Sequence, residues 1–171
     1  PLPTILVSTT GTSQLLPGQR TGVTANISPT GGSFVWTLNG TTINNASGPT
    51  ITPITVDGAG TYQAVYTDLN GCSITSTPLV ISAQQSDRLW VYPNPNNGVF
   101  QIRYYNNFGE PVKVMVYNAA GQLVYSKQPI LGEAYSRIDV NLSNQAAGIY
   151  IVKLISGNGK ELAAKRIIIA K

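Results

Sequence analysis

The chain of 171 residues contains no histidine and a single cysteine, Cys72. Without histidine, Ser-His-Asp and Cys-His nucleophile systems and the usual zinc sites are excluded. One cysteine cannot form a disulfide within the chain, so stability must come from core burial unless Cys72 pairs outside it. We expect Cys72 to be a small, half-buried residue beside a turn. The sequence predicts no catalytic residue, no cofactor and no metal site.

Charged residues are also scarce, at 11% of the chain, against about 25% in an average soluble domain. Residues 1–84 hold one Arg against two Asp, a net charge of −1, whereas residues 85–171 hold ten Lys and Arg against five Asp and Glu, a net charge of +5. The basic residues are dispersed rather than clustered, so we do not expect nucleic-acid binding. The asymmetry indicates two units with different surfaces.

Long apolar runs are missing as well. No run approaches the roughly 20 residues that cross a bilayer, so we expect no membrane span. The sequence opens at Pro1 without a methionine or a basic and apolar leader, and we expect it to be a piece of a longer precursor.

What the chain does contain is typical of β structure: Thr, Ser, Asn, Gly, Val, Ile and Tyr are frequent. In residues 1–84 we expect about seven short strands separated by turn signals such as Asn39-Gly40. Trp36 lies in mid-strand, and the run 57–62 resembles the tyrosine corner of immunoglobulin-like domains. This part is similar to the immunoglobulin-like or PKD-like modules of bacterial surface proteins, which usually serve as spacers.

The polar run 82–87 predicts a linker, after which residues 88–171 form a second unit. Residues 148–155 are apolar on both faces apart from Lys153, which indicates a central strand. The seven strands that we expect here cover residues 89–92, 99–105, 112–117, 123–128, 134–142, 148–156 and 162–170. The fold class is therefore all-β, with two antiparallel, immunoglobulin-like β-sandwiches in tandem, and we expect a monomer.

The second unit contains four distinctive blocks: Tyr92-Pro-Asn-Pro-Asn-Asn-Gly-Val-Phe100, Val116-Tyr-Asn-Ala-Ala-Gly-Gln-Leu-Val124, Ala147-Gly-Ile-Tyr-Ile-Val152 and Lys165-Arg-Ile-Ile-Ile-Ala-Lys171. Together they resemble the type A C-terminal sorting domains of the type IX secretion system of Bacteroidota. One block alone is a weak signal, but four in the family's order and spacing are a strong one.

Two interpretations of the motif residues stay open. They specify the fold, since proline and glycine set bends and positive φ, or they contact the secretion machinery. We further expect Lys165 and Lys171 to share a strand face with Ile167 and Ile169, opposite Arg166. The candidate residues are Tyr92, Pro93, Asn94, Pro95, Gly98, Phe100, Gly121, Gly148, Tyr150, Lys165, Arg166 and Lys171.

The resemblance implies a signal and not a catalyst. The domain would direct a folded cargo through the outer-membrane translocon by way of a carrier protein, and a cell-surface sortase complex would then remove it. The cargo would end at the cell surface or outside the cell, with residues 1–84 as its last module. The expected cleavage region is the exposed stretch Ser82, Ala83, Gln84, Gln85, Ser86, Asp87 and Arg88.

Two other classes of function are a carbohydrate-binding module and an enzyme. A carbohydrate-binding or adhesive module would use an aromatic platform, and the candidates are Trp90, Tyr104, Tyr105 and Tyr135. Tyr104 and Tyr105 are adjacent on one strand, so they face opposite sides. A two-carboxylate glycosidase would need a convergent acidic pair, but no motif links any two of Asp57, Asp68, Asp87, Glu110, Glu133, Asp139 and Glu161.

Overall fold

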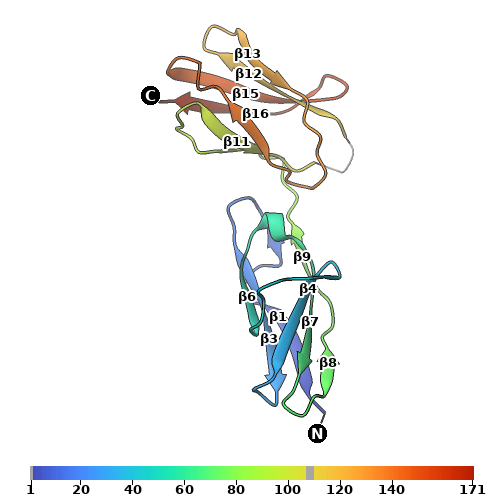
Figure 1. The fold of residues 1–171 in the computed structure, drawn as a ribbon. Coiled ribbons are helices and arrows are strands. Elements are labelled where there is room, and N and C mark those ends of the chain that lie inside the picture. The colour runs from blue at the N-terminus through green and yellow to red at the C-terminus, as the bar shows by residue number, and fades with distance from the viewer. Residues whose placement is uncertain (1, 107–109) are drawn as a thin grey trace. The chain divides into compact units, whose positions relative to one another are not determined.

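The computed structural model describes residues 2–106 and 110–171. Across these residues the ordered elements are β-strands and one short 3-10 turn, and the chain divides into two compact units, residues 1–84 and 85–171 (Figure 1). The predicted all-β class is confirmed. None of the helical structure in the described part of the chain is long and apolar enough to cross a membrane.

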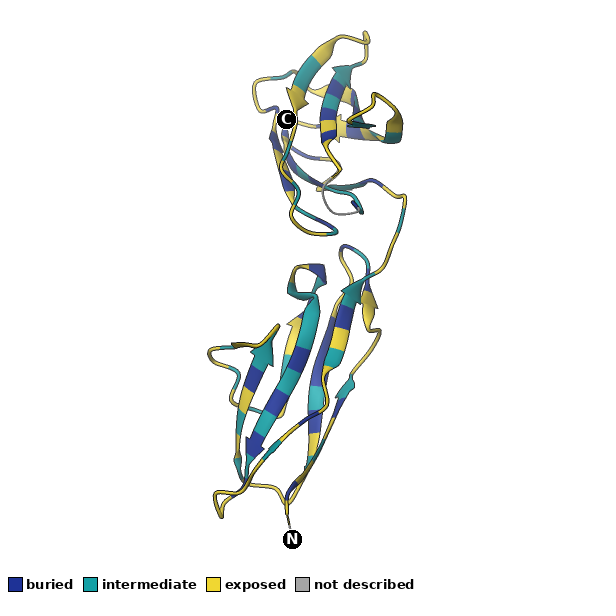
Figure 2. Cartoon of the chain, turned by 90° about the vertical axis from the view of Figure 1, so that its right-hand side faces the viewer, coloured by how far each residue is buried: buried dark blue, intermediate teal, exposed yellow. Residues whose placement is uncertain are grey.

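The first unit is a sandwich of two sheets. One sheet has the strand order β1-β3-β6, formed by Thr4–Thr9, Thr21–Ser28 and Thr50–Ile54. The other has the order β2-β9-β7-β4-β5, formed by Gln14–Leu15, Leu79–Ala83, Gly60–Thr67, Ser33–Leu38 and Thr41–Thr42, and β8 (Ser73–Thr75) also pairs with β7. Buried and exposed residues alternate along the long strands (Figure 2), as one-sided packing of a sheet requires.

The features that predicted an immunoglobulin-like unit are present in its core. Trp36 is fully buried opposite Ala64 on the neighbouring strand, and its Nε1–H donates to the carbonyl of Gly48 at 2.8 Å. The hydroxyl of Tyr62 donates to the carbonyl of Gly58 at 2.7 Å, which confirms the tyrosine corner. Trp36 and Tyr62 therefore lie on β4 and β7, which pair as neighbours in one sheet.

Of two local predictions, the hairpin at Asn39-Gly40 is confirmed and the environment of Cys72 is confirmed only in part. Asn39 and Gly40 have φ values of 51° and 81° in the two-residue β4–β5 hairpin, as a type I′ turn requires. Cys72 does lie in a turn, between β7 and β8, but it is exposed instead of half-buried. The expected burial failed because the hairpin loop turns the side chain to solvent while Asp68, at 7% exposure, occupies the buried position of that loop.

The predicted linker, residues 82–87, begins too early. Ser82 and Ala83 belong to β9 and pair in parallel with Gln14 and Leu15, and the Gln84 N–H donates to the Leu15 carbonyl at 2.9 Å. Their side chains are polar or small, but the strand is set by its pairing with β2, a two-residue strand with no sequence pattern of its own. The irregular segment starts at Gln85.

The second unit is also a sandwich. Its smaller sheet has the order β10-β11-β14, formed by Trp90–Tyr92, Val99–Arg103 and Ile138–Asn141. Its larger sheet has the order β13-β12-β15-β16, formed by Leu123–Lys127, Val112–Asn118, Gly148–Ser156 and Glu161–Ile169. β15 is central, as predicted. The strand predicted over residues 134–142 is observed only as Ile138–Asn141. Tyr135 lies before it, in the loop that leads to β14, and is buried there.

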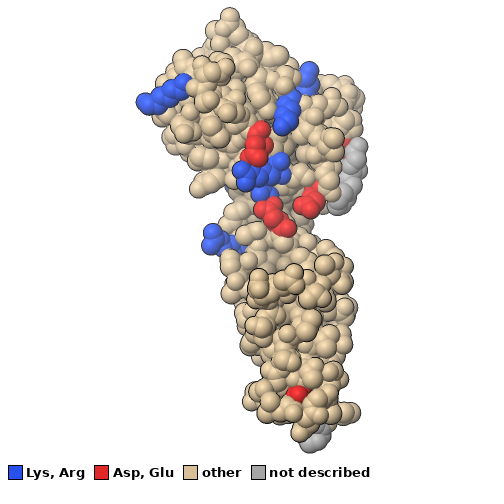
Figure 3. All heavy atoms as spheres, viewed as in Figure 1, with Lys and Arg blue, Asp and Glu red and all other residues tan. Residues whose placement is uncertain are grey.

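The core of the second unit consists of alternating apolar residues from the inner faces of both sheets, among them Phe100, Val114, Val152 and Ile167. Charged residues gather on this unit in the view of Figure 3, whereas the first unit shows few. The surfaces of the two units therefore differ as their compositions predict.

Candidate recognition site

The Pro-Asn-Pro segment between β10 and β11 lies against the edge of β16. The Asn94 side chain makes two bonds to that strand: its Oδ1 accepts from the N–H of Ile168 at 2.9 Å, and its Nδ2 donates to the carbonyl of Arg166 at 3.3 Å. These backbone groups point away from β15, so a strand edge would otherwise expose them. The amide of Asn94 thus takes the place of a neighbouring strand.

Asn96 continues this contact through its backbone. Its N–H donates to the carbonyl of Ile168 at 3.0 Å, and its carbonyl accepts from the N–H of Ala170 at 2.8 Å, which makes a parallel bridge to Ile169. The Asn96 side chain is 7% exposed and accepts from the Gly98 N–H at 2.8 Å. Residues 94–96 therefore close one half of the β16 edge.

Gly98 and Phe100 hold this segment to the core. Gly98 has a φ of 99°, and a Cβ there would lie 2.8 Å from the carbonyl oxygen of Leu142. Gly98 and Leu142 are also joined by a backbone hydrogen bond, in which the Leu142 N–H donates to the Gly98 carbonyl at 2.6 Å. Phe100 is 2% exposed in the core. Both residues have a structural role, and the positive φ predicted at Gly98 is confirmed.

Tyr150 forms a second tyrosine corner. Its hydroxyl donates to the carbonyl of Ala146 at 2.8 Å, four residues upstream, as that of Tyr62 does to Gly58. The predicted positive φ is present at Gly148, with 157°, and at Gly121, with 76°, in the turn after β12. Tyr150 is 5% exposed, so its side chain packs inside the sandwich and does not project to a partner.

On the terminal strand, β16, Lys165 shares a face with Ile167 and Ile169, as predicted. This face is directed into the sandwich: the two isoleucines are 0% and 1% exposed in the core, and Lys165 is half-buried. The Lys171 ammonium donates to the carbonyl of Ser143 at 2.8 Å. The face of β16 that reaches solvent carries Arg166 and Ile168. Lys171, which follows the strand, is exposed as well, so a role of Lys165 and Lys171 in recognition stays a prediction.

Apolar side chains cover the outer face of the larger sheet, a surface that we call the apolar face. Ile149 and Ile168 are cross-strand partners and are 47% and 39% exposed. Tyr117 of β12 pairs with Leu123 on one side and with Ile151 on the other, and Leu123 is 48% exposed. The outer face of an antiparallel sheet is often polar, whereas all four strands of this sheet carry an apolar residue on that face.

Basic residues border the apolar face. Arg166 is the cross-strand partner of Ile151, and Lys153 lies two residues further along β15. The Lys153 ammonium bonds the Glu161 carboxylate at 2.8 Å, and this hydrogen bond raises the pKa of Lys153. Sequence reasoning did not single out the apolar residues of this face. The sequence signal for them is that residues 148–155 are apolar on both faces, which predicts a central strand and also an apolar outer surface.

The aromatic residues considered for a sugar platform do not form one. Tyr135 is 3% exposed, and its ring meets that of Tyr105 edge-on at 5.5 Å and 75°. Tyr104 packs against the core. Burial raises the pKa of both Tyr104 and Tyr135. Trp90 lies on the outer face of the smaller sheet, opposite Arg103, and Tyr92 on the same face is 69% exposed.

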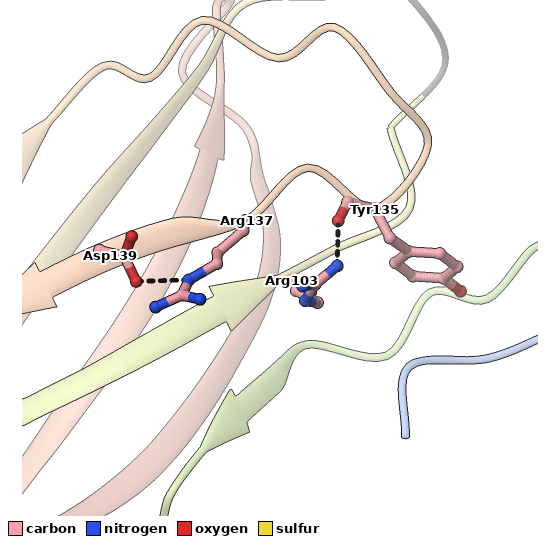
Figure 4. A network of polar contacts seen from close by, with 4 residues as sticks. All are labelled: Arg103, Tyr135, Arg137 and Asp139. Carbon is pink, nitrogen blue, oxygen red and sulfur yellow. Dashed lines mark hydrogen bonds and ion pairs between the residues drawn. The ribbon is translucent and has the colours of Figure 1, made fainter. Parts of the chain in front are cut away.

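No cluster of three or more His, Cys, Asp or Glu that could hold a metal ion is found within residues 2–106 and 110–171. The acidic residues with resolved contacts are used locally: Asp139 pairs with Arg137 at 2.7 Å (Figure 4), and Asp68 accepts from two N–H groups of its own loop.

The second unit is similar to known proteins. Residues 90–170 match the model of the secretion system C-terminal sorting domain. Ulvan lyase NLR42 of Nonlabens ulvanivorans is 32% identical over 108 residues, which are 63% of this chain but only 19% of that enzyme.

Solved structures that are similar over nearly the whole chain include the following two. The N-terminal domains of the bacteriophage RB49 outer capsid protein Hoc are 14% identical, with a TM-score of 0.41, over 98% of this chain and 58% of that one. The human OSCAR ligand-binding domain is 13% identical, with a TM-score of 0.39, over 97% and 95%. At these TM-scores the structural matches carry no further argument.

The family match covers the four sequence blocks except Lys171, and the blocks meet in one sandwich, in which the first and the last block are hydrogen-bonded to each other. The second unit therefore belongs to the C-terminal sorting domains of the type IX secretion system, which mark proteins for export to the cell surface or the extracellular space.

Proposed function

We propose that residues 85–171 direct a cargo through the type IX outer-membrane translocon, and that a carrier protein reads the apolar face of the larger sheet. In this proposal the first unit is a spacer module of the cargo, and a cell-surface sortase complex removes the signal after passage. The observation that carries it is the group of apolar residues on this face, of which Leu123, Ile149 and Ile168 are exposed and Tyr117 and Ile151 are half-buried.

Three of the four sequence blocks supply this row. Leu123 and Tyr117 come from the second block, Ile149 and Ile151 from the third, and Ile168 from the fourth. The first block lies along the edge of the same sheet through Asn94 and Asn96. Exposed apolar clusters on small domains mark interaction sites, and burial of apolar area contributes about 25 cal/mol per Å². The basic border favours a partner with acidic residues around an apolar groove.

The test is export of a fluorescent reporter fused in front of residues 85–171, behind a signal peptide, in a host with a working type IX system. The double variant Ile149→Thr/Ile168→Thr keeps β-branched side chains on the strands but makes the surface polar. We expect reporter to stay in the periplasm with this variant while the unmodified fusion is exported. A matched control, Val99→Thr/Ile130→Thr, changes two exposed apolar residues elsewhere on the unit and is expected to export normally.

Equal export of the two double variants, both folded by circular dichroism, would assign recognition to another surface. Retention of the unmodified fusion would refute the sorting function itself. The two failures are therefore distinguishable in one experiment.

For the cleavage site we propose the stretch from Gln85 to Arg88, within the region first expected. Ser82 and Ala83 are paired in β9, and Leu89 is 3% exposed in the core of the second unit. Gln85, Asp87 and Arg88 are exposed and lie outside any strand, which is where a protease reaches the backbone. Mass spectrometry of the exported reporter is expected to find its new C-terminus within these residues.

A further inference from the structure

The chain contains four Asn-Gly pairs, and each of them connects two strands. They are Asn39-Gly40, Asn70-Gly71, Asn97-Gly98 and Asn158-Gly159. An asparagine in such a pair is open to an internal reaction, because the backbone nitrogen of glycine carries no neighbouring side chain that would hinder its attack on the asparagine Cγ. This reaction needs the nitrogen to lose its proton, so the hydrogen bonds of the glycine N–H distinguish the four pairs.

In three of the pairs the glycine N–H is engaged. The N–H of Gly71 donates to the Asp68 carbonyl at 3.1 Å, that of Gly98 to Asn96 Oδ1 at 2.8 Å, and that of Gly159 to the Ser156 carbonyl at 2.9 Å. Each bond stabilises the proton on the nitrogen and turns the nitrogen away from its own asparagine. The folded chain therefore protects these three pairs.

Gly40 differs from the other three glycines. It is exposed, as is Asn39, and its N–H has no hydrogen-bond partner among the residues that the structure describes. A Cβ at this position would meet no atom within 4 Å, so hydroxide and water reach the peptide from all sides. The nitrogen of this pair is therefore free to react.

The side chain of Asn39 is held in place by β7. Its Oδ1 accepts from the N–H of Thr61 at 2.9 Å, while the Asn39 N–H donates to the Thr61 carbonyl at 2.9 Å. The side-chain oxygen thus replaces the backbone carbonyl of Asn39, which leaves the ladder because φ is 51° at this residue. When Cγ is attacked, negative charge develops on Oδ1, and the Thr61 N–H is already directed at that atom.

Attack requires rotation about the Cα–C bond of Asn39, which moves Gly40 toward the side chain. The strand that follows is β5, which consists of Thr41–Thr42, is exposed and lies at the end of its sheet. Short edge strands open at low free energy. The next contact along the chain is the hydrogen bond from the Ile43 N–H to the Trp36 carbonyl at 2.8 Å, so a local movement of residues 40–42 is sufficient.

We propose that Asn39 is a deamidation site and the first of the four pairs to react in the folded chain. The nitrogen of Gly40 bonds to Cγ of Asn39, and the side-chain amide leaves as ammonia, which produces a succinimide ring. Water then opens the ring at either carbonyl and leaves aspartate or isoaspartate at position 39. Both products add a carboxylate, so the net charge of residues 1–84 changes from −1 to −2. Isoaspartate also adds a methylene group to the backbone of a two-residue hairpin, whose geometry depends on its length.

The proposal does not depend on the export function, because all of its residues lie in the first unit. The test is incubation of the full chain in mildly alkaline buffer, with parallel incubation in guanidinium chloride at the same pH, followed by peptide mapping with mass spectrometry. In guanidinium chloride we expect similar rates at the four pairs, because they share the same dipeptide. In buffer we expect Asn39 to react at least about tenfold faster than each of the other three. Equal rates in buffer, or a faster reaction at another pair, would overturn the proposal.

Two variants give an independent readout by ion-exchange chromatography of the incubated chain. Asn39→Asp already carries the new carboxylate, which can still accept from the Thr61 N–H, so this variant should form further acidic species about tenfold more slowly than the unmodified chain. Asn158→Asp has the same net charge and is the control, and it should form them at the unmodified rate. Equal rates in the two variants would place the reaction at another residue and refute the assignment to Asn39.

Discussion

Asn94 and Ile168 are 74 residues apart in the sequence, and the side-chain oxygen of the first accepts a hydrogen bond from the backbone N–H of the second at 2.9 Å. The amide nitrogen of Asn94 also reaches the carbonyl of Arg166. The first and last sequence blocks of the sorting domain are therefore parts of one structural feature, in which a side chain replaces a β-strand at a sheet edge.

This relationship predicts the cost of changing Asn94. Asn94→Ala leaves the Ile168 N–H and the Arg166 carbonyl to solvent, and we expect a loss of about 1 kcal/mol in the free energy of unfolding. Asn94→Asp is expected to lose more, because a carboxylate oxygen would face the Arg166 carbonyl. Urea unfolding of the chain measures both. The exposed Asn144→Ala is the control and should change stability by less than about 0.5 kcal/mol.

Gly98 offers a sharper test of the same segment. A Cβ at this position would lie 2.8 Å from backbone atoms of Leu142 and Ser143, on a residue with a φ of 99°. We expect Gly98→Ala to destabilise the second unit by about 2 kcal/mol or more, because both strain and collision oppose it. Gly121→Ala has a similar φ of 76° but meets no atom within 4 Å, so it should cost less. Equal losses of stability in the two variants would show that the positive φ, and not the close contact, determines the effect.

The two tyrosine corners predict matched effects in the two units. Tyr62→Phe and Tyr150→Phe each remove one hydroxyl that donates to a carbonyl four residues upstream. We expect each to lower the stability of its own unit by about 0.5–1.5 kcal/mol and to leave the other unit unchanged. Thermal unfolding followed by calorimetry would show which transition moves. A shift of both transitions by one substitution would contradict this independence.

Tyr62 also predicts a pH dependence. Burial raises the pKa of its phenol above the usual value near 10. The neutral form is favoured in the folded state, so this contribution to stability is fully present below pH 10 and is lost as the pH rises through the folded pKa. Residues 1–84 contain no lysine, so amino side chains do not obscure the effect. Unfolding midpoints between pH 8 and 11 should fall less in Tyr62→Phe than in the unmodified chain.

Modularity is the last prediction. Fragments 1–84 and 85–171 each contain two sheets with their own core, and we expect each to unfold cooperatively with a β-type circular dichroism spectrum. Residues 1–84 should be the less stable, because a unit this small without a disulfide buries a limited fraction of its surface. If neither fragment folded alone, the division into independent units would be wrong.

Much of this molecule follows from local sequence. Alternation of apolar and polar residues is a property of adjacent side chains, so the strands 99–105, 112–117, 148–156 and 162–170 were predicted almost at their observed bounds. The positive φ values of Gly98, Gly121 and Gly148 and the Tyr62 corner were likewise predicted, because a turn imposes its backbone geometry on the residues that form it. The four motif blocks were sufficient to predict the family.

Tertiary structure decided what those residues contact. The pairing of Ser82 and Ala83 with Gln14 and Leu15 depends on a strand nearly 70 residues away, so a polar sequence alone predicted a linker there. Likewise the sequence determined that Arg166 and Ile168 share one face of a strand and that Ile167 and Ile169 share the other. Which face is buried depends on the side from which the second sheet packs, and only the folded sandwich decided that Ile168, together with Ile149, reaches solvent.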